Sequence, residues 1–528
     1  MRIVLDNLGG APVTKCLWSA VFALTLLAAP SAQQPPFDIL IVNARVLDGT
    51  GNPWIRADIA IRGDRIVAMG NLAGAPAALL IDAKDRYVAP GFMDVHSHAA
   101  GALAGTQLRE ARPLLAQGVT TIVGNPDGGG PVDLAAQARQ LTNAGPGVNV
   151  ALVIGHASVR NAVMGQSQRR DPTSDELQKM RALVRQARLD GAFGLSSGLF
   201  YQPGRFAKTE EVIALAREAG GVYTSHIRDE GTYDVGVIAS VDEVIRVAEE
   251  AGVAGIVSHM KCLGPDSWGI STTLVANIEK ARARGVQVFA DQYPYDASST
   301  SLQAATMPND GAATAAEAMG NPVAKEKFLA MVRENVRRRG GAKAIVIASG
   351  RGAAGLAGQN LEQIAAARTV TPEQAAVDIV MAGSASIISF NMSEDDIATI
   401  MRQTWTMGSS DGDLTAPGPG VSHPRNNGSA ARRISRYVRD RGTVSLEHAV
   451  RTMTSLPARV FGFEDRGEIR VGAFADLVVF DLKHVQDRAT YESPHELSEG
   501  FDWVIVNGQI ARREGEFTGV RAGRILKK

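Results

Sequence analysis

Short apolar runs that recur through the middle of the chain constrain its fold more than any other feature. Each run ends in polar residues, and segments with helical periodicity separate one run from the next. In chain order they read GFMDVHSH, GVTTIVGN, VNVALVIGH, GAFGLSSGL, GGVYTSHIR, GVAGIVSHM, GVQVFADQY and TWTMGSSDG. About eight strand–helix repeats are what a closed parallel barrel needs. We therefore expect an α/β fold with a (β/α)8 TIM-like barrel over residues 91–460.

The helical segments between these runs carry recognisable start signals. Thr173 with Glu176, and Ser240 with Glu243, both fit the capping box, in which a hydroxyl and a carboxylate bind free backbone N–H groups. These pairs predict helices that begin at residues 173 and 240.

The two ends of the chain show the period-two alternation of short antiparallel strands instead. We expect residues 37–90 and 461–528 to form one small β-sandwich domain, with the barrel inserted between its halves. The span 299–403 is too long for a single loop of a barrel and contains further apolar pieces, which predicts an inserted subdomain there.

The N-terminal segment predicts export. Lys15 precedes an apolar run from Leu17 to Ala29, which is short for a membrane span and is followed by a polar, Pro-rich stretch. We expect residues 1–36 to be a signal peptide and linker, which makes the mature protein periplasmic or secreted and free of the membrane.

The charge balance favours a small-molecule substrate. Lys and Arg total 55, and Asp and Glu also total 55, so no long-range field attracts nucleic acid or an anionic surface. The sequence leaves the oligomeric state open.

Histidines at the ends of the predicted strands carry the strongest functional signal. His96, His98, His226 and His259 all fall there, and Asp411 follows the eighth run. Carboxyl ends of barrel strands meet on one face, where neutral imidazoles can bind a divalent metal. A single such histidine is as often a hydrogen-bonded core residue, but the joint occurrence favours a metal site. Asp411 can ligate the metal, accept a proton from the attacking water and return it to a leaving amine.

Several motifs together resemble a known family. The runs APGFMDVHSH, GVTT, GLFYQPG, SHIRDEG, SHMK, QYPYDASS, SSDG and HPR are similar to the N-acyl-D-amino-acid deacylase (D-aminoacylase) branch of the amidohydrolase superfamily, collinearly from about Phe37 to the C-terminus. The resemblance implies Zn2+ held by the four histidines, with Asp411 as general base and acid. The implied reaction hydrolyses the amide bond of N-acyl-D-amino acids through a metal-activated water.

The same resemblance implies recognition of the substrate's free carboxylate by Lys261, Tyr293 and Arg425, with Ser299 nearby. Cationic side chains and a phenol suit such a group in a water-poor pocket. Each residue also has a plainer interpretation: Lys261 could be solvated, Tyr293 could be a rim aromatic, and Arg425 could pair with a structural carboxylate.

The chain departs from this family after the second strand. A run like GNCG, whose cysteine binds metal, is expected there, but this chain has GNPDGGG, and Pro126 offers no donor atom. Asp127 is either a replacement ligand or a turn residue beside three glycines. A carboxylate is a harder ligand and would admit manganese, cobalt or iron. We expect one tightly bound metal and a weak second site.

Other interpretations remain open. The same barrel could serve a dipeptidase, a cyclic amidase or an esterase, or could belong to a non-catalytic secreted binding protein. His156 could support the site or belong to the core, and Arg228, Asp229 and Glu230 could orient His226 or form a surface network.

Overall fold

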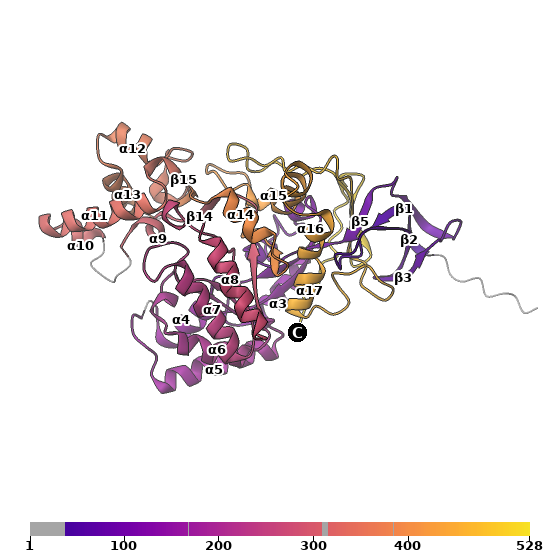
Figure 1. Cartoon of the computed structure of the whole chain (residues 1–528), viewed down its shortest axis with the longest axis horizontal. Coiled ribbons are helices and arrows are strands. Elements are labelled where there is room, and N and C mark those ends of the chain that lie inside the picture. The colour runs from indigo at the N-terminus through magenta and orange to yellow at the C-terminus, as the bar shows by residue number, and fades with distance from the viewer. Residues whose placement is uncertain (1–36, 167, 309–314, 384) are drawn as a thin grey trace, which may run out of the picture. The chain divides into compact units, whose positions relative to one another are not determined.

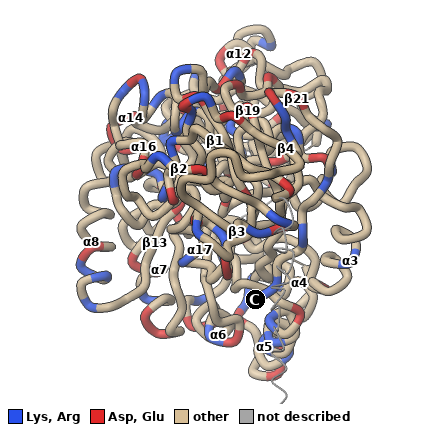
Figure 2. Tube along the Cα trace, turned by 90° about the vertical axis from the view of Figure 1, so that its right-hand side faces the viewer, with Lys and Arg blue, Asp and Glu red and all other residues tan. Residues whose placement is uncertain are grey.

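The computed structural model describes residues 37–166, 168–308, 315–383 and 385–528. The predicted signal peptide, residues 1–36, lies outside these ranges. No helix within them is long and apolar enough to cross a bilayer. Basic and acidic residues are interspersed along the face shown in Figure 2, as the equal totals of the two kinds allow.

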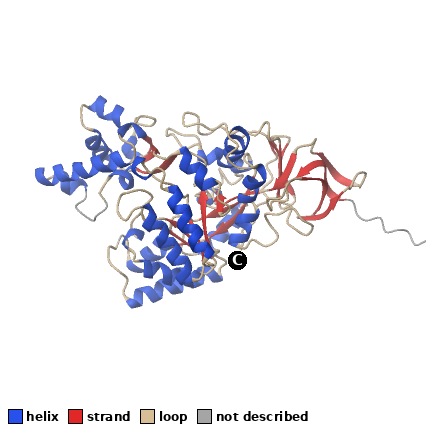
Figure 3. Ribbon diagram, viewed as in Figure 1, coloured by secondary structure: helices blue, strands red, loops and turns tan. Residues whose placement is uncertain are grey.

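A parallel barrel forms the centre of the described chain. Its strands, which helices surround in Figure 3, are β6 (Phe92–Asp94), β7 (Val119–Gly124), β8 (Asn149–Leu152), β9 (Ile154–Gly155), β10 (Gly194–Gly198), β11 (Val222–His226), β12 (Ala254–Val257), β13 (Val288–Gln292) and β17 (Thr406–Gly408). β8 pairs with β7 and β9 with β10, so these two are halves of one strand interrupted at Val153. A parallel bridge between Ser97 and Gly412 closes the ring. The predicted barrel is confirmed.

Helices cover the outside of this barrel (Figure 1). They include α3 (Leu134–Ala144), α4 (His156–Met164), α5 (Ser174–Leu189), α6 (Thr209–Ala219), α7 (Val237–Ala251), α8 (Ser271–Ala283) and α14 (Glu394–Met401). The shorter helical segments are α1 (Ala100–Leu103), α2 (Arg112–Leu115), α15 (Arg425–Arg432), the π-helix η5 (Arg433–Asp440), α16 (Leu446–Thr452) and α17 (Ser455–Phe461).

One of the two predicted capping boxes is present. Thr173 and Glu176 cap α5 reciprocally. The prediction for Ser240 was wrong, because α7 begins one turn earlier, after Gly236. Inside the helix the Ser240 hydroxyl donates to the Gly236 carbonyl at 3.0 Å, while Glu243 accepts from Arg228.

Strands from both chain ends join in one nine-stranded sheet. They are β1 (Phe37–Val46), β2 (Ile55–Arg62), β3 (Arg65–Gly70), β4 (Ala77–Asp82), β5 (Tyr87–Pro90), β18 (Leu477–Phe480), β19 (Phe501–Val506), β20 (Gln509–Arg513) and β21 (Glu516–Phe517). β5 links the two halves by pairing with β1 and β18, and one apolar core contains residues of both. Residues 523–528 leave this sheet and bond to Val150 and Gly191 of the barrel.

An insertion follows the seventh barrel strand. Its antiparallel strands are β14 (Ala297–Ser301), β15 (Ile345–Ser349) and β16 (Ser386–Phe390), and its helices are α9 (Leu302–Thr306), α10 (Ala315–Met319), α11 (Pro322–Arg338), α12 (Leu361–Arg368) and α13 (Pro372–Ala382). It has a separate apolar core. Helix α14 packs against α8 of the barrel, and its residues are not part of the apolar core of the insertion.

A buried carboxylate connects the sheet to the barrel. Asp476 is 5% exposed and accepts hydrogen bonds from Asn507 N at 2.7 Å, from Asn149 Nδ2 at 3.1 Å and from the Arg466 guanidinium. Removing it would leave the Arg466 cation buried without its counter-charge.

We therefore expect Asp476→Ala to lower the free energy of unfolding by about 3–5 kcal/mol, measured from the first unfolding transition in urea. The control is Glu499→Ala, which breaks an ion pair with Arg488 whose side chains are 55% and 54% exposed; it should cost less than about 1 kcal/mol. Equal effects of the two variants would contradict this role.

Candidate metal centre and substrate cavity

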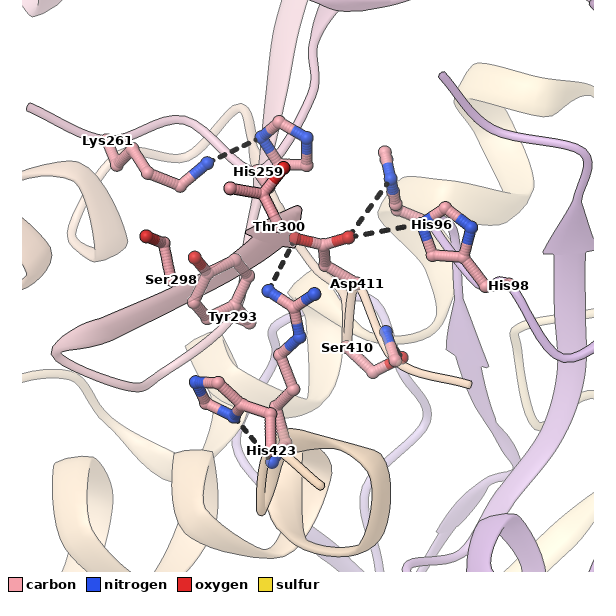
Figure 4. Close-up of polar contacts among 12 residues, drawn as sticks. His96, His98, His259, Lys261, Tyr293, Ser298, Thr300, Ser410, Asp411 and His423 are labelled. Atoms are coloured by element: carbon pink, nitrogen blue, oxygen red, sulfur yellow. Dashed lines mark hydrogen bonds and ion pairs between the residues drawn. The ribbon is translucent and has the colours of Figure 1, made fainter. Parts of the chain in front are cut away.

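The structure brings the four predicted histidines together at the carboxyl ends of the strands, and Figure 4 labels three of them, His96, His98 and His259. Ring centroids of His96 and His259 are 4.8 Å apart, those of His226 and His259 are 4.5 Å apart, and those of His96 and His98 are 5.7 Å apart. His226 Nδ1 lies 2.8 Å from His259 Nε2. His96 is fully buried, whereas the His98 side chain is 38% exposed, so the group reaches from the interior to the mouth of the barrel.

Two carboxylates face these rings. Asp411 Oδ1 lies 3.3 Å from His98 Nε2 and 3.5 Å from His96 Nε2. Asp127 Oδ1 lies 3.4 Å from His96 Nε2 and 3.7 Å from His259 Nε2. One donor atom from each of His96, Asp127, His259 and Asp411 fits within 4.8 Å of the others. Asp127 is thus both a turn residue, with φ of 56°, and a member of the cluster.

Backbone strain accompanies this arrangement. His259 has φ of 35° and Asp411 has φ of 50°, a region that costs such residues about 1–3 kcal/mol each. Buried carboxylates hold these two segments: Asp291 accepts from His259 N at 2.9 Å, and Asp94 accepts from Ser410 N at 2.8 Å. The strained positions aim the imidazole and the carboxylate at a common point.

The donor set fits a divalent cation. Among the described residues, His96 Nδ1, His96 Nε2, His226 Nε2 and Asp127 Oδ1 are buried polar atoms without a hydrogen-bond partner. Each such atom costs roughly 1–3 kcal/mol. Burial lowers the pKa of His226 to about 4, which keeps this ring neutral. Against the effect of burial, the neighbouring carboxylates raise the pKa of His98 and of His259 to about 10, so a cation would displace a proton from each of these two rings. Burial alone would raise the pKa of Asp411, but Arg425 holds it well below its usual range. Neutral imidazoles and ionised carboxylates are ligands for zinc.

Glu230 joins the site from the SHIRDEG run. Its Oε1 accepts from Lys261 Nζ at 2.5 Å, and Lys261 Nζ also lies 2.7 Å from His259 Nδ1. Donor atoms of His226, Glu230 and His259 form a second group that could hold a cation. The neighbouring Asp229 accepts from backbone N–H groups of its own loop. Glu230 therefore belongs to the site.

A cavity of about 320 Å³ opens beside these groups, within the size range of small-molecule sites. It is lined by His98, Asp127, Phe200, Tyr201, His226, Glu230, His259, Lys261, Leu263, Tyr293, Ser298, Ser299, Thr300, Arg339, Asp411 and Arg425. All four residues predicted to bind substrate are among them. The insertion supplies Arg339 and, from its strand β14, three hydroxyl residues, and the barrel with its loops supplies the rest, so two structural units build this cavity.

The predicted carboxylate-binding residues already interact with the metal-site residues. Arg425 NH1 donates to Asp411 Oδ2 at 2.7 Å. The Tyr293 ring lies 4.8 Å from the Arg425 guanidinium and 5.5 Å from Lys261 Nζ. Arg425 thus pairs with a carboxylate, as its plainer interpretation predicted, and it also lines the cavity.

Some residues of the site were not predicted from the sequence. Asp291 lies one residue before the end of the buried strand β13, and a carboxylate near the end of a buried strand was the available signal. Glu230 had only its place in the run that follows His226, which left a surface network equally open, and Arg339 had no signal, because the geometry of the insertion places it. His156 belongs to the core: it is fully buried and lies 2.9 Å from Glu211 in a network with Arg160. It is not among the residues that line the cavity.

Comparisons with known proteins agree with this geometry. Residues 79–512 match the model of a family described as the amidohydrolase family. The chain is 37% identical to an N-acyl-D-glutamate deacylase of Alcaligenes xylosoxydans xylosoxydans, over 94% of this chain and 97% of that one. It is 36% identical to a D-aminoacylase of the same organism, over 93% and 98%.

A solved structure shows the same relationship. The N-acyl-D-glutamate deacylase of Bordetella bronchiseptica, complexed with zinc and a phosphonate that mimics the tetrahedral intermediate, gives a TM-score of 0.80 at 35% identity. The match covers 93% of this chain and 100% of that one.

Asp127→Asn tests whether this carboxylate replaces the missing cysteine. Asparagine tolerates positive φ but removes the charge, so we expect zinc affinity to fall by at least about 10-fold, measured by competition with a chelating dye. Asp133→Asn, at the exposed N-cap of α3, is the control and should bind zinc normally. Unchanged affinity in Asp127→Asn would make Asp127 a turn residue only.

Proposed function

The chain belongs to the amidohydrolase family, and we propose that it hydrolyses the amide bond of N-acyl-D-amino acids, releasing a D-amino acid and a carboxylate. The observation that carries this proposal is one cavity in which a cluster of metal donors directly adjoins Lys261, Tyr293 and Arg425. The donors serve hydrolysis, and the cationic groups suit a substrate with a free carboxylate. The relatives described above are named for this reaction.

The proposed cofactor is Zn2+, held by donors from His96, His98, His226, His259, Asp127 and Asp411. A divalent cation there would polarise the acyl carbonyl and acidify the attacking water. We propose a single tight site. The Lys261 ammonium lies against Glu230 and His259, and its charge would repel a second cation from the group that these residues form with His226.

Asp411 has the position of a proton carrier. Arg425 binds its Oδ2, while Oδ1 faces His96 and His98. The carboxylate takes a proton as the water oxygen bonds to the acyl carbon, and it gives that proton to the nitrogen as the C–N bond breaks. Since Arg425 keeps the pKa of Asp411 low, the protonated form is a strong acid toward the leaving amine.

Asp411→Asn tests this role. We expect kcat to fall by about 10²–10⁴-fold, because the amide cannot carry the proton, while folding and most of the zinc are retained. Asp413→Asn is the matched control; the Asp413 carboxylate accepts a bond from the backbone N of Leu414, outside the donor cluster. Turnover of Asp411→Asn close to that of Asp413→Asn would contradict the assignment.

A substrate panel tests the reaction itself. With zinc supplied, we expect N-acetyl-D-amino acids to be hydrolysed and their L-enantiomers to be hydrolysed at least about 100-fold more slowly, as followed by release of free amine. Because Pro126 replaces the expected cysteine ligand, hydrolysis of another type of substrate bond is the alternative. Turnover of dipeptides, cyclic amides or esters in place of the D-substrates would support that alternative, and no turnover at all would support a binding protein.

We also propose that the protein is exported and acts on a small molecule, without nucleic acid or membrane partners. The apolar run after Lys15 and the balanced charge support this. Expression of the full chain with N-terminal sequencing of the periplasmic fraction is the test. A mature protein that begins between residues 30 and 37 is the expected result, and full-length protein in the cytoplasm would contradict it.

A further inference from the structure

We propose that Arg339 binds a second carboxylate of the substrate, which makes N-acyl-D-amino acids with acidic side chains the preferred class. This inference rests on the proposed function. It assigns to the inserted subdomain the selection of the amino-acid side chain.

Arg339 is placed in the cavity by the end of a helix. Helix α11 ends at Arg338, and the Arg339 N–H bonds the Val336 carbonyl at 3.2 Å. Gly340 and Gly341, with φ of 93° and 92°, then turn the chain away. Arg339 is 2% exposed yet lines the cavity with Lys261 and Arg425. The insertion thus contributes a buried cation to the substrate site.

Arg339 differs from the other two cations of the cavity in its partners. Lys261 pairs with Glu230, and Arg425 pairs with Asp411. Over the described ranges, no carboxylate forms an ion pair with Arg339, and its Nε has no hydrogen-bond partner. Its neighbours are neutral: the Tyr233 ring at 5.7 Å, and the Asn391 amide, whose oxygen accepts from NH1 at 3.3 Å in the orientation that satisfies both ends.

A buried guanidinium without a counter-charge is costly. Such a group persists where a ligand supplies the missing anion, and its planar fork fits a carboxylate with two parallel hydrogen bonds. A bound carboxylate would therefore neutralise the unpaired charge of Arg339.

The charge of the whole cavity points to two carboxylates on the substrate. Three cationic residues, Lys261, Arg339 and Arg425, face three carboxylates, Asp127, Glu230 and Asp411. Histidines that coordinate a metal do so as neutral imidazoles, so a bound divalent cation would leave two positive charges in excess of the carboxylates. Proton transfer from water to Asp411 does not change this balance. A free α-carboxylate neutralises one charge, and an acidic side chain neutralises the other.

The test compares kcat/KM of N-acetyl-D-glutamate and N-acetyl-D-leucine in zinc-loaded protein. Wild type should prefer the glutamate. Arg339→Met should lower kcat/KM for the glutamate by about 100-fold, about 2.7 kcal/mol, with a change below about 3-fold for the leucine. Arg339→Lys should restore part of the loss. Arg337→Met is the control, because Arg337 is 55% exposed and paired with Asp266, and it should leave both substrates unaffected.

A stability measurement separates recognition from a structural role. Removing an unpaired buried cation should leave ligand-free Arg339→Met at least as stable as wild type in urea, whereas loss of a structural contact would destabilise it. A wild-type preference for the leucine, equal losses on both substrates, or clear destabilisation would overturn the inference.

Calorimetric binding to the Asp411→Asn variant distinguishes this inference from the proposed function. If no N-acyl-D-amino acid is hydrolysed, the proposed function fails. In that case the assignment of Arg339 would still be supported by two results. N-acetyl-D-glutamate should bind at least about 10-fold more tightly than N-acetyl-D-leucine, and the added substitution Arg339→Met should abolish this difference. Equal binding of the two compounds would refute it.

Discussion

Imidazole rings and carboxylates crowd into one small volume at the mouth of the barrel, and the site depends on how this crowding is relieved. Parallel strands bring their carboxyl ends to one face, so residues as distant in sequence as His96 and Asp411 come within 3.5 Å. Several of these atoms lack hydrogen-bond partners. A divalent cation satisfies nitrogen and oxygen donors at once, and the Arg425 and Lys261 pairs fix the carboxylates that face them.

Each structural unit contributes to this arrangement. The barrel supplies the donors, and the bridge between Ser97 and Gly412 brings the first and last strands together beside Asp411. The nine-stranded sheet ties both chain ends to the barrel through Asp476 and Asn149. The insertion supplies β14 and Arg339 to the cavity. The metal donors thus lie in the barrel, and in our proposal the insertion selects the side chain of the substrate.

The sequence was informative wherever a residue's place follows from local pattern. Apolar runs marked the barrel strands, and histidines directly after these runs had to meet. Pattern was insufficient where contacts arise between segments. Ser240 has the spacing of a helix cap, but α7 begins at Val237. The spacing of a hydroxyl and a carboxylate alone does not determine where a helix begins. Glu230 and Arg339 enter the cavity through a loop and a helix end, whose directions no periodicity records.

The central claim is that this cluster binds zinc through nitrogen and oxygen atoms alone. Pro126 stands where a cysteine ligand was expected. Cys262 is buried, burial raises the pKa of its thiol, and it does not belong to either group of metal donors. X-ray absorption spectroscopy of the zinc-loaded protein tests this most directly. The account predicts one zinc per chain with a first shell of nitrogen and oxygen at about 2.0–2.2 Å. A sulfur shell near about 2.3 Å, or a chain that retains no zinc, would contradict it.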